Sequence, residues 1–479
     1  MATLLQTSNK DTSTVKNLSF SAVLLSVALT SPLYLANAQV SLIAKGTLTS
    51  SRAGDYEDLS GLKGKLENGA PADLLGGLGS GLAHISGDRF LAIPDRGPNA
   101  ITYNTAIDNT ASYIERFHTI DMKLKKARKD DESGLPFTIE PKLESTQLLS
   151  SLTPLVYGSG IGLSVGDGEP KQNNFIQYFF TGRSDNYDPD RNSGYAKDAR
   201  LDPESIRLSN DGLTVFISDE YGPYVYQFLR FGGVRLRTLT LPQTFFVSNL
   251  SPIGNTEISG NTSGRTANKG MEGLAITPDG RTLVGIMQAA LIQDAKEGGA
   301  AANLLRLITI DIASGKTTHE YAYLLTTGSG VSDIVALNNH EFLVDERDGK
   351  GLGDGSKAKV KQLFKIDLKD AVDTSEMDGT AAAANAVPKS LFLDLVKVLN
   401  ANGITADQIP AKIEGVALGE DVTVDGGKLH TLWIANDNDF LQDYSGPNTN
   451  PNQFFVFGFK DADLNGSVYV PQQRFGYKD

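Results

Sequence analysis

The stretch EGLAITPDGRTLVGIMQ, residues 272–288, carries the signals of a β-hairpin. A short alternating run starts at Glu272, a Pro-Asp-Gly turn follows at 278–280, and a nearly continuous apolar run comes next. Proline, aspartate and glycine have the backbone preferences that a tight turn between antiparallel strands requires. The stretch therefore predicts two paired strands, the first of which begins with an acid.

The same plan occurs four more times in the chain. The other copies are SGLAHISGDRFLAIPDRG from Ser80, ESIRLSNDGLTVFISDEYG from Glu204, SDIVALNNHEFLVDERDG from Ser332 and EGVALGEDVTVDGGKLHTLWIANDND from Glu414. A further β-like run follows each copy, for example YVYQFLRF and VKQLFKIDL. Recurrence of a four-stranded unit along a chain is typical of a propeller. We predict an all-β protein, a β-propeller of six blades with loop insertions, with five or seven blades as alternatives.

Three other strand-like regions, around 40–50, 138–150 and 173–181, are expected to build the sixth blade. One helix is expected over 389–404, where the apolar spacing is close to 3.6 residues. No linker between two independent cores is evident, so residues 39–479 are predicted to form one propeller domain.

The first 38 residues have the pattern of a signal peptide. Lys10 and Lys16 precede the apolar run LSFSAVLLSVAL, and Ala36-Asn37-Ala38 supplies a cleavage site. The alternative is a membrane anchor, but the run is shorter than the roughly 20 residues that a span needs. We expect cleavage near Ala38 and a secreted or periplasmic protein without a membrane span.

Composition narrows the class of function. The formal net charge of −13 argues against a nucleic-acid partner. The chain has no cysteine and only five histidines, none of them in a zinc-binding spacing, so a metal here would be held by oxygen ligands. Calcium is the first candidate for such a site outside the cytoplasm.

Repeated positions in a propeller lie at equal heights around the central channel, so the repeated acids are expected to form two rings. The acids at the repeat starts are Glu204, Glu272 and Glu414, with Ser80 and Asp333 in the other copies. The acids and amides at the ends of the second strands are Asp95, Asp219, Glu220, Asp345, Glu346, Asn436, Asp437 and Asn438. Facing carboxylates repel one another unless a cation lies between them, and these ligand types suit calcium. The alternative for each acid is an ordinary hydrogen bond at a blade corner.

Basic residues accompany the acids. Arg96, Lys269 and Arg347 are the candidates for holding an anion such as a phosphoryl group. Arg207 and Lys412 also lie beside repeated acids.

The sequence resembles the phytase-like family, also called esterase-like activity of phytase. The matching segments are DRGPN at Asp95, DPESIRLSNDG at Asp202, SDEYGP at Ser218, NKGMEGLAITPDGRTL at Asn268, DERDG at Asp345, KIEGVALG at Lys412 and ANDNDF at Ala435. The resemblance implies a secreted β-propeller related in plan to calcium-dependent phytases. Ser80 and Met287 depart from fully acidic rings, which leaves the number of metal sites open.

The leading hypothesis is an exported, monomeric, calcium-dependent phosphoric-ester hydrolase that acts on phytate or another small phosphoester, with water as the nucleophile. The proposed catalytic residues are Glu272, Glu414, Arg96, Lys269 and Arg347. The proposed metal ligands are Asp95, Glu204, Asp219, Glu220, Glu272, Asp345, Glu346, Glu414, Asn436 and Asn438. Two alternatives stay open: a carboxylic-ester or lactone hydrolase with one channel calcium, which Asn436 and Asn438 would suit, and a non-catalytic binding propeller whose calcium clamps the blades.

Overall fold

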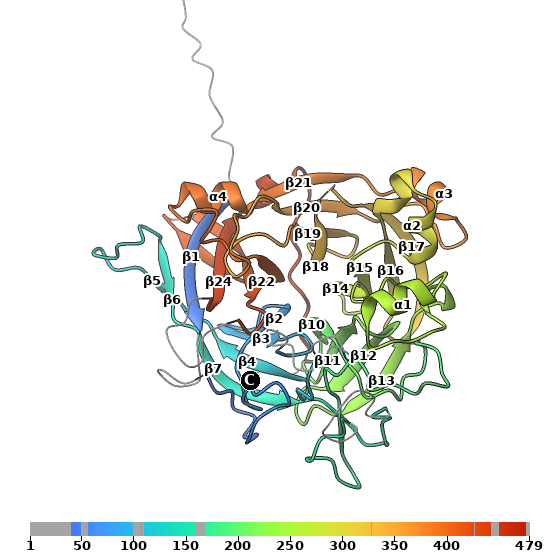
Figure 1. Ribbon diagram of the computed structural model, residues 1–479. Coiled ribbons are helices and arrows are strands. Elements are labelled where there is room, and N and C mark those ends of the chain that lie inside the picture. Colours follow the sequence, from blue (N-terminus) through green and yellow to red (C-terminus); the bar gives the residue numbers. More distant parts are fainter. Residues whose placement is uncertain are drawn as a thin grey trace, which may run out of the picture. The chain divides into compact units, whose positions relative to one another are not determined.

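The computed structural model describes residues 40–48, 56–98, 107, 110–158, 168–326, 328–425, 427–441 and 450–475. The described residues all lie in one compact unit, Ala38–Asp479. The predicted signal peptide lies outside the described residues. Within the unit the described residues form five four-stranded antiparallel sheets, arranged as the blades of a propeller (Figure 1).

Each blade is a meander whose first strand lies nearest the propeller axis. The first blade is β2 (Gly81–Ser86), β3 (Arg89–Ile93), β4 (Arg116–Asp121) and β7 (Lys142–Leu148). The second is β10 (Pro203–Leu208), β11 (Thr214–Asp219), β12 (Tyr224–Leu229) and β13 (Arg235–Thr240). The third is β14 (Met271–Ile276), β15 (Thr282–Met287), β16 (Leu304–Asp311) and β17 (Lys316–Leu324). The fourth is β18 (Gly330–Ala336), β19 (Glu341–Arg347), β20 (Lys361–Asp367) and β21 (Lys389–Asp394).

The fifth blade joins the two ends of the described chain. It consists of β22 (Lys412–Val424), β23 (Gly427–Asp437), β24 (Asn452–Phe459) and, at its outer edge, β1 (Ser41–Leu48). β1 is antiparallel to β24, with Ser41 opposite Gly458 and Leu48 opposite Asn452. The N-terminal strand thereby closes the ring by completing the last blade.

The propeller prediction is confirmed, and its five-blade alternative holds in place of the favoured six blades. The innermost strands contact one another in a closed order, β2, β10, β14, β18, β22 and back to β2, which makes five blades. The regions expected to form a sixth blade complete other sheets. Region 40–50 supplies β1, region 138–150 supplies β7, and region 173–181 supplies only β9 (Tyr178–Phe179), which pairs with the two-residue β8 (Ser150–Ser151).

The single helix expected over 389–404 is also wrong in its first half. Residues 389–394 form β21, which pairs with β20, and α4 (Leu395–Ala401) begins only after Asp394. The Asp394 carboxylate accepts a hydrogen bond from the backbone N–H of Lys397, so it acts as the helix N-cap. Pairing of residues 389–394 with the open edge of β20 and the cap at Asp394 favour a strand followed by a short helix over the single helix that the apolar spacing predicts.

The remaining elements lie in the loops between strands. They are the helices α1 (Gly254–Gly260), α2 (Ile292–Lys296) and α3 (Gly379–Ala384), the 3-10 helices Gln243–Phe245, Gly299–Asn303 and Asp461–Leu464, and the hairpin β5 (Leu124–Lys126) and β6 (Phe137–Ile139). Among the described residues, no helix has the length and apolar character needed to span a bilayer.

Candidate functional site

A β-bulge recurs at the start of the innermost strand in four blades. The pairing register shifts between Pro203 and Ile206, between Met271 and Gly273, between Val331 and Asp333, and between Ile413 and Val416. Each interval contains the first residue of a sequence repeat: Glu204, Glu272, Ser332 and Glu414. A bulge redirects a side chain relative to its neighbours in the strand. The repeated acids are therefore presented at the same end of the propeller axis by the same local device.

Glycine follows the acid in the third and fifth blades, and close packing of the strands explains this Glu-Gly pair. A Cβ atom on Gly273 would lie 2.9 Å from the backbone carbon of Asp333 in the next innermost strand. A Cβ atom on Gly415 would lie 2.9 Å from the carbonyl oxygen of Gly79. Glycine is needed here because five innermost strands pack closely around one axis.

The first acidic cluster consists of Asp202, Glu204 and Glu220. One carboxylate oxygen from each lies within 4.8 Å of the others, and all three side chains are buried. Burial, with repulsion from neighbouring carboxylates, raises the pKa of Glu204 and of Glu220 well above the usual range. Asp202 also accepts hydrogen bonds from the backbone N–H of Arg96 at 3.0 Å and from its guanidinium at 2.9 Å.

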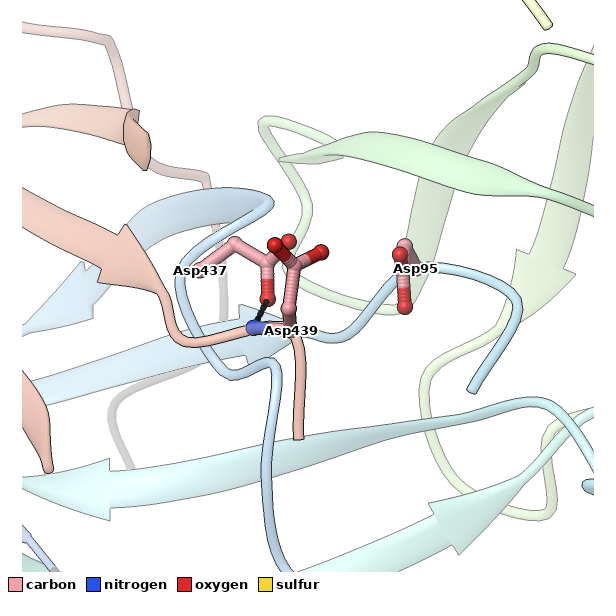
Figure 2. A group of neighbouring side chains, drawn as sticks. All are labelled: Asp95, Asp437 and Asp439. Atoms are coloured by element: carbon pink, nitrogen blue, oxygen red, sulfur yellow. Dashed lines mark hydrogen bonds between the residues drawn. The ribbon is translucent and has the colours of Figure 1, made fainter. Parts of the chain in front are cut away.

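The second acidic cluster consists of Asp95, Asp437 and Asp439. Its carboxylate oxygens also lie within 4.8 Å of one another. Figure 2 shows Asp437 and Asp439 at the end of β23, with Asp95 facing them from the segment after β3. Lys412 lies beside this cluster and donates to Asp437 at 2.7 Å and forms an ion pair with Asp439. Three acids therefore share one lysine, and burial raises the pKa of Asp437 to about 7.

Glu272 and Glu414 each keep one buried oxygen without a hydrogen-bond partner. Glu272 Oε1 accepts from the Gln288 amide at 2.6 Å, and Glu414 Oε1 accepts from the Arg347 guanidinium. Oε2 of both residues is buried and unpartnered. Burial, followed by the charge of Glu414, raises the pKa of Glu272 to about 8. An unpaired buried carboxylate oxygen is costly, and a bound cation would remove that cost.

Several predicted ligands have other surroundings. Asp219 accepts from the backbone N–H groups of Asp202 and Tyr221, at 3.1 and 3.0 Å. Glu346 accepts from the Tyr323 hydroxyl, the Ser329 hydroxyl and the Lys389 ammonium on the outer side of its blade.

The two predicted amide ligands are engaged with backbone groups. Asn436 Oδ1 accepts from the N–H of Gln453 at 2.5 Å, and Asn438 Oδ1 accepts from the N–H of Gly77 at 2.7 Å. The structure therefore does not bring Asp219, Glu346, Asn436 and Asn438 into the acidic clusters as available ligands.

Asp345 is fully buried, and neither of its carboxylate oxygens has a hydrogen-bond partner. It lies opposite Asp333, which binds Arg207 through both oxygens at 2.8 Å. Burial raises the pKa of Asp345 well above its usual range. Asp333 stands one residue after the bulge position, so Ser332, and not Asp333, corresponds to Glu272 in the fourth blade.

The three predicted anion-binding residues differ in how far their side chains are already engaged in hydrogen bonds and ion pairs. Arg96 contacts Asp202 and also donates to the Asn268 side chain at 2.6 Å, while Arg347 contacts Glu414 and donates to the Ser332 hydroxyl at 2.8 Å. Lys269 is exposed, and no ion pair within the described ranges involves its ammonium group. Asn268 has φ of 54°, a left-handed conformation that non-glycine residues adopt rarely and that is common at functional sites.

Sequence reasoning did not place three residues of the site. Asp202 and Asp439 lie within the acidic clusters, and Lys412, which the sequence marked beside Glu414, lies beside the second cluster. Glu115 is fully buried with both oxygens unpartnered, and burial and the charge of Asp202 raise its pKa well above the usual range. The spacing Asp202-x-Glu204 and the run 436–439 held a signal for the first two. Glu115 lies outside the repeats, so nothing in the pattern marked it.

A cavity of about 420 Å³ is lined by Gln288 and Arg347, which contact Glu272 and Glu414. Lys269 and residues of the segments after β15 and before β18 also line it. A cavity of this size suits a small organic molecule.

Comparisons with known proteins relate the chain to one family. The family model "Phytase-like: Esterase-like activity of phytase" matches residues 73–440. An uncharacterized secreted protein of Arthroderma benhamiae is 33% identical over 177 residues, which are 31% of this chain and 34% of that protein. The chain thus spans about a third of the length of that curated relative.

Solved structures also align with the chain. A luciferin-regenerating enzyme is 10% identical with a TM-score of 0.31, covering 84% of this chain and 96% of that chain. A putative 6-phosphogluconolactonase from Bacteroides uniformis is 12% identical with a TM-score of 0.30, covering 84% and 92%. Because the family model covers most of the chain, this protein belongs to the phytase-like family, whose description is "Esterase-like activity of phytase".

Proposed function

We propose that this protein is an exported, calcium-dependent phosphoric-ester hydrolase whose site lies at the end of the axis where the innermost strands begin. The observation that carries the proposal is the density of buried carboxylates there. Two groups of three acids have oxygens within 4.8 Å of one another, and Glu272 and Glu414 add buried oxygens without partners. The relative from Arthroderma benhamiae is called secreted, which supports export.

The residues fit calcium by type and number. Calcium takes six to eight oxygen ligands, chiefly carboxylates, and tolerates irregular geometry. Asp202, Glu204 and Glu220 would hold one ion, with Glu272 and Glu414 beside them. Asp95, Asp437 and Asp439 would hold a second, although Lys412 already supplies one positive charge to that cluster. A bound calcium ion supplies positive charge to the phosphoryl oxygens and increases the acidity of a water molecule.

The basic residues would bind and orient the phosphoryl group. Lys269 is free to contact a substrate oxygen, and Arg347 presents a guanidinium fixed by Ser332 and Glu414. Arg96 is fixed by Asp202 and Asn268 on the opposite side. In the reaction the oxygen of water bonds to phosphorus, the ester P–O bond breaks, and the alcohol leaves with one proton from the water.

The amide contacts argue against the lactone-hydrolase alternative. That alternative relied on Asn436 and Asn438 as calcium ligands, and both side-chain oxygens accept hydrogen bonds from backbone N–H groups. The basic residues around the acids favour a phosphoryl group over a neutral carboxylic ester.

The test is hydrolysis of phenyl phosphate and of phenyl acetate by the purified full chain, with calcium or with a chelator. We expect phenyl phosphate turnover that disappears with the chelator and returns with calcium. Turnover of phenyl acetate alone would establish the carboxylic-ester alternative. Thermal stabilisation by calcium without turnover of either ester would establish the non-catalytic clamp.

A further inference from the structure

The cavity lined by Gln288 and Arg347 has two kinds of lining residue. Lys269 and Arg347 supply its positive charge. Most of its other lining residues are small or apolar, among them Ala290, Ala302 and Val331. The neutral side chains of Gln288, Asn303 and Ser329 supply the remaining polar groups.

Two lining residues connect the cavity directly to the proposed calcium ligands. Gln288 donates to Glu272 at 2.6 Å, and Arg347 donates to Glu414. A phosphoryl group placed between Lys269 and Arg347 would therefore lie next to these carboxylates. The group esterified to it would extend into the rest of the cavity.

Beyond Lys269 and Arg347, the lining offers no positive charge for a second phosphate. Within the described ranges these two are the basic residues that line the cavity, and Arg347 is already paired with Glu414. The one lining acid, Asp348, already contacts Lys361 at 2.8 Å and accepts from the N–H groups of Lys359 and Val360. A phosphate dianion placed among alanine, leucine and valine side chains would lose hydration without gaining a partner.

We propose that this cavity receives the alcohol part of the substrate, and that the preferred substrate carries one phosphoryl group on a small, uncharged, partly apolar alcohol. This inference rests on the proposed function, because it places the phosphoryl group at the same acidic clusters. It assigns the choice of substrate to Ala302, Asn303 and their neighbours.

A second group of basic residues offers the competing possibility. Arg96, Arg200 and Arg265 line a smaller cavity of about 20 Å³ on the other side of the acids. Arg96 contacts Asp202 at 2.9 Å and Arg265 contacts Glu257 at 2.8 Å, so two of the three charges are already paired. Its volume suits a water molecule better than a phosphate group.

The experiment compares phenyl phosphate with para-phenylene bisphosphate, which has the same ring with a second phosphate. With calcium present, we expect kcat/KM to be about 10-fold or more higher for phenyl phosphate, equivalent to about 1.4 kcal/mol. The variant Asn303→Arg, which adds a positive charge to the cavity lining, should raise the ratio of kcat/KM for the bisphosphate to kcat/KM for phenyl phosphate.

A binding measurement separates this inference from the proposed function. Calorimetry with phenylphosphonate, which has no ester bond to cleave, should show that Ala302→Trp weakens binding about 10-fold by filling the cavity. Ala401→Trp is the matched control, because Ala401 is also exposed but lies at the end of α4, outside the cavity.

Absence of turnover of both esters would overturn the proposed function, and the phosphonate measurement would then decide the role of the cavity. Turnover of both esters with preference for the bisphosphate would keep the hydrolase and overturn the substrate class, and would point to Arg96, Arg200 and Arg265. Equal phosphonate affinity in Ala302→Trp and Ala401→Trp would also overturn the inference.

Discussion

Adjacent residues at the ends of the second strands have opposite surroundings. In the second to fifth blades, the later residue of the pair contacts the carboxylates at the axis or belongs to them; these residues are Glu220, Gln288, Arg347 and Asp437. The residue before it contacts backbone groups, the blade interior or an outer strand; these residues are Asp219, Met287, Glu346 and Asn436. The alternation follows from the period of two along a β-strand. A shift of one residue therefore decides whether an acid belongs to the site.

His118 provides a test of burial at the residue scale. It lies in β4 with its Nδ1 2.9 Å from the Thr146 hydroxyl oxygen and its Nε2 buried without a partner. Burial lowers the pKa of His118 to about 4, against 6.5 in its ordinary state. Below pH 6.5 the unfolded chain therefore binds a proton at His118 that the folded chain does not. The contribution of the neutral, buried His118 to the free energy of unfolding is full above pH 6.5 and is lost as the pH falls toward 4.

The substitution His118→Gln removes this titration. Between pH 7 and pH 5 the native protein should lose about 2 kcal/mol more of its free energy of unfolding than the variant, as measured by urea unfolding. Parallel pH dependence in the two proteins would show that His118 is protonated in the folded state.

At the scale of elements, the bulge and the glycine that follows it act together. The bulge turns Glu272 toward the axis, and Gly273 lets β14 approach β18. An acid followed by a small residue thus occurs at the start of the second, third and fifth blades, whereas the fourth has Ser332 followed by Asp333. The first blade keeps the small residue in Gly81 and has Ser80 in the place of the acid.

The substitution Gly273→Ala tests this arrangement. The added methyl group would lie 2.8 Å from Ile286 Cγ2 and 2.9 Å from the backbone of Asp333. We expect a loss of about 1–3 kcal/mol in urea unfolding, because the neighbouring strand must move. The control is Gly260→Ala in α1, where the nearest atom is 3.6 Å away. Equal stability of the two variants would contradict the close packing of the innermost strands.

The repeat pattern was sufficient to predict the hairpins, the propeller and the acids at the bulges. It was not sufficient for the number of blades, because the sequence of β1 does not reveal that it pairs with β24 across the whole chain. It also failed to predict which of two adjacent side chains, Glu346 or Arg347 and Asn436 or Asp437, points toward the acids at the axis. The reason is that the position of a β-bulge decides which side chains of a strand share a face. Glu115 was missed because its neighbours in space, such as Asp202, are distant in sequence.

At the scale of the whole molecule, one ion pair ties four blades at the axis. Arg207 of the second blade donates to the Leu82 carbonyl of the first and to Asp333 of the fourth. Asp333 in turn accepts from the backbone N–H of Val416 in the fifth blade at 2.9 Å. The pair links strands that are far apart in sequence, so the ring depends on it.

Breaking this pair should destabilise the whole domain. Arg207→Met leaves the buried Asp333 charge uncompensated, and we expect a loss of about 3–5 kcal/mol in urea unfolding. The double variant Arg207→Met with Asp333→Leu should regain part of that loss, because no buried charge remains. A single variant as stable as the native protein would show that the pair does not hold the ring.

The central claim is that the carboxylates at the axis bind calcium, and calorimetric titration of the full chain with calcium tests it most directly. Glu272→Gln keeps size and hydrogen bonding but removes one charge, so calcium affinity should fall about 10-fold or more. Glu144→Gln, on the exposed side of β7, is the matched control and should bind calcium like the native protein. Equal calcium affinity in Glu272→Gln and Glu144→Gln, or no calcium binding by the native protein, would contradict the account.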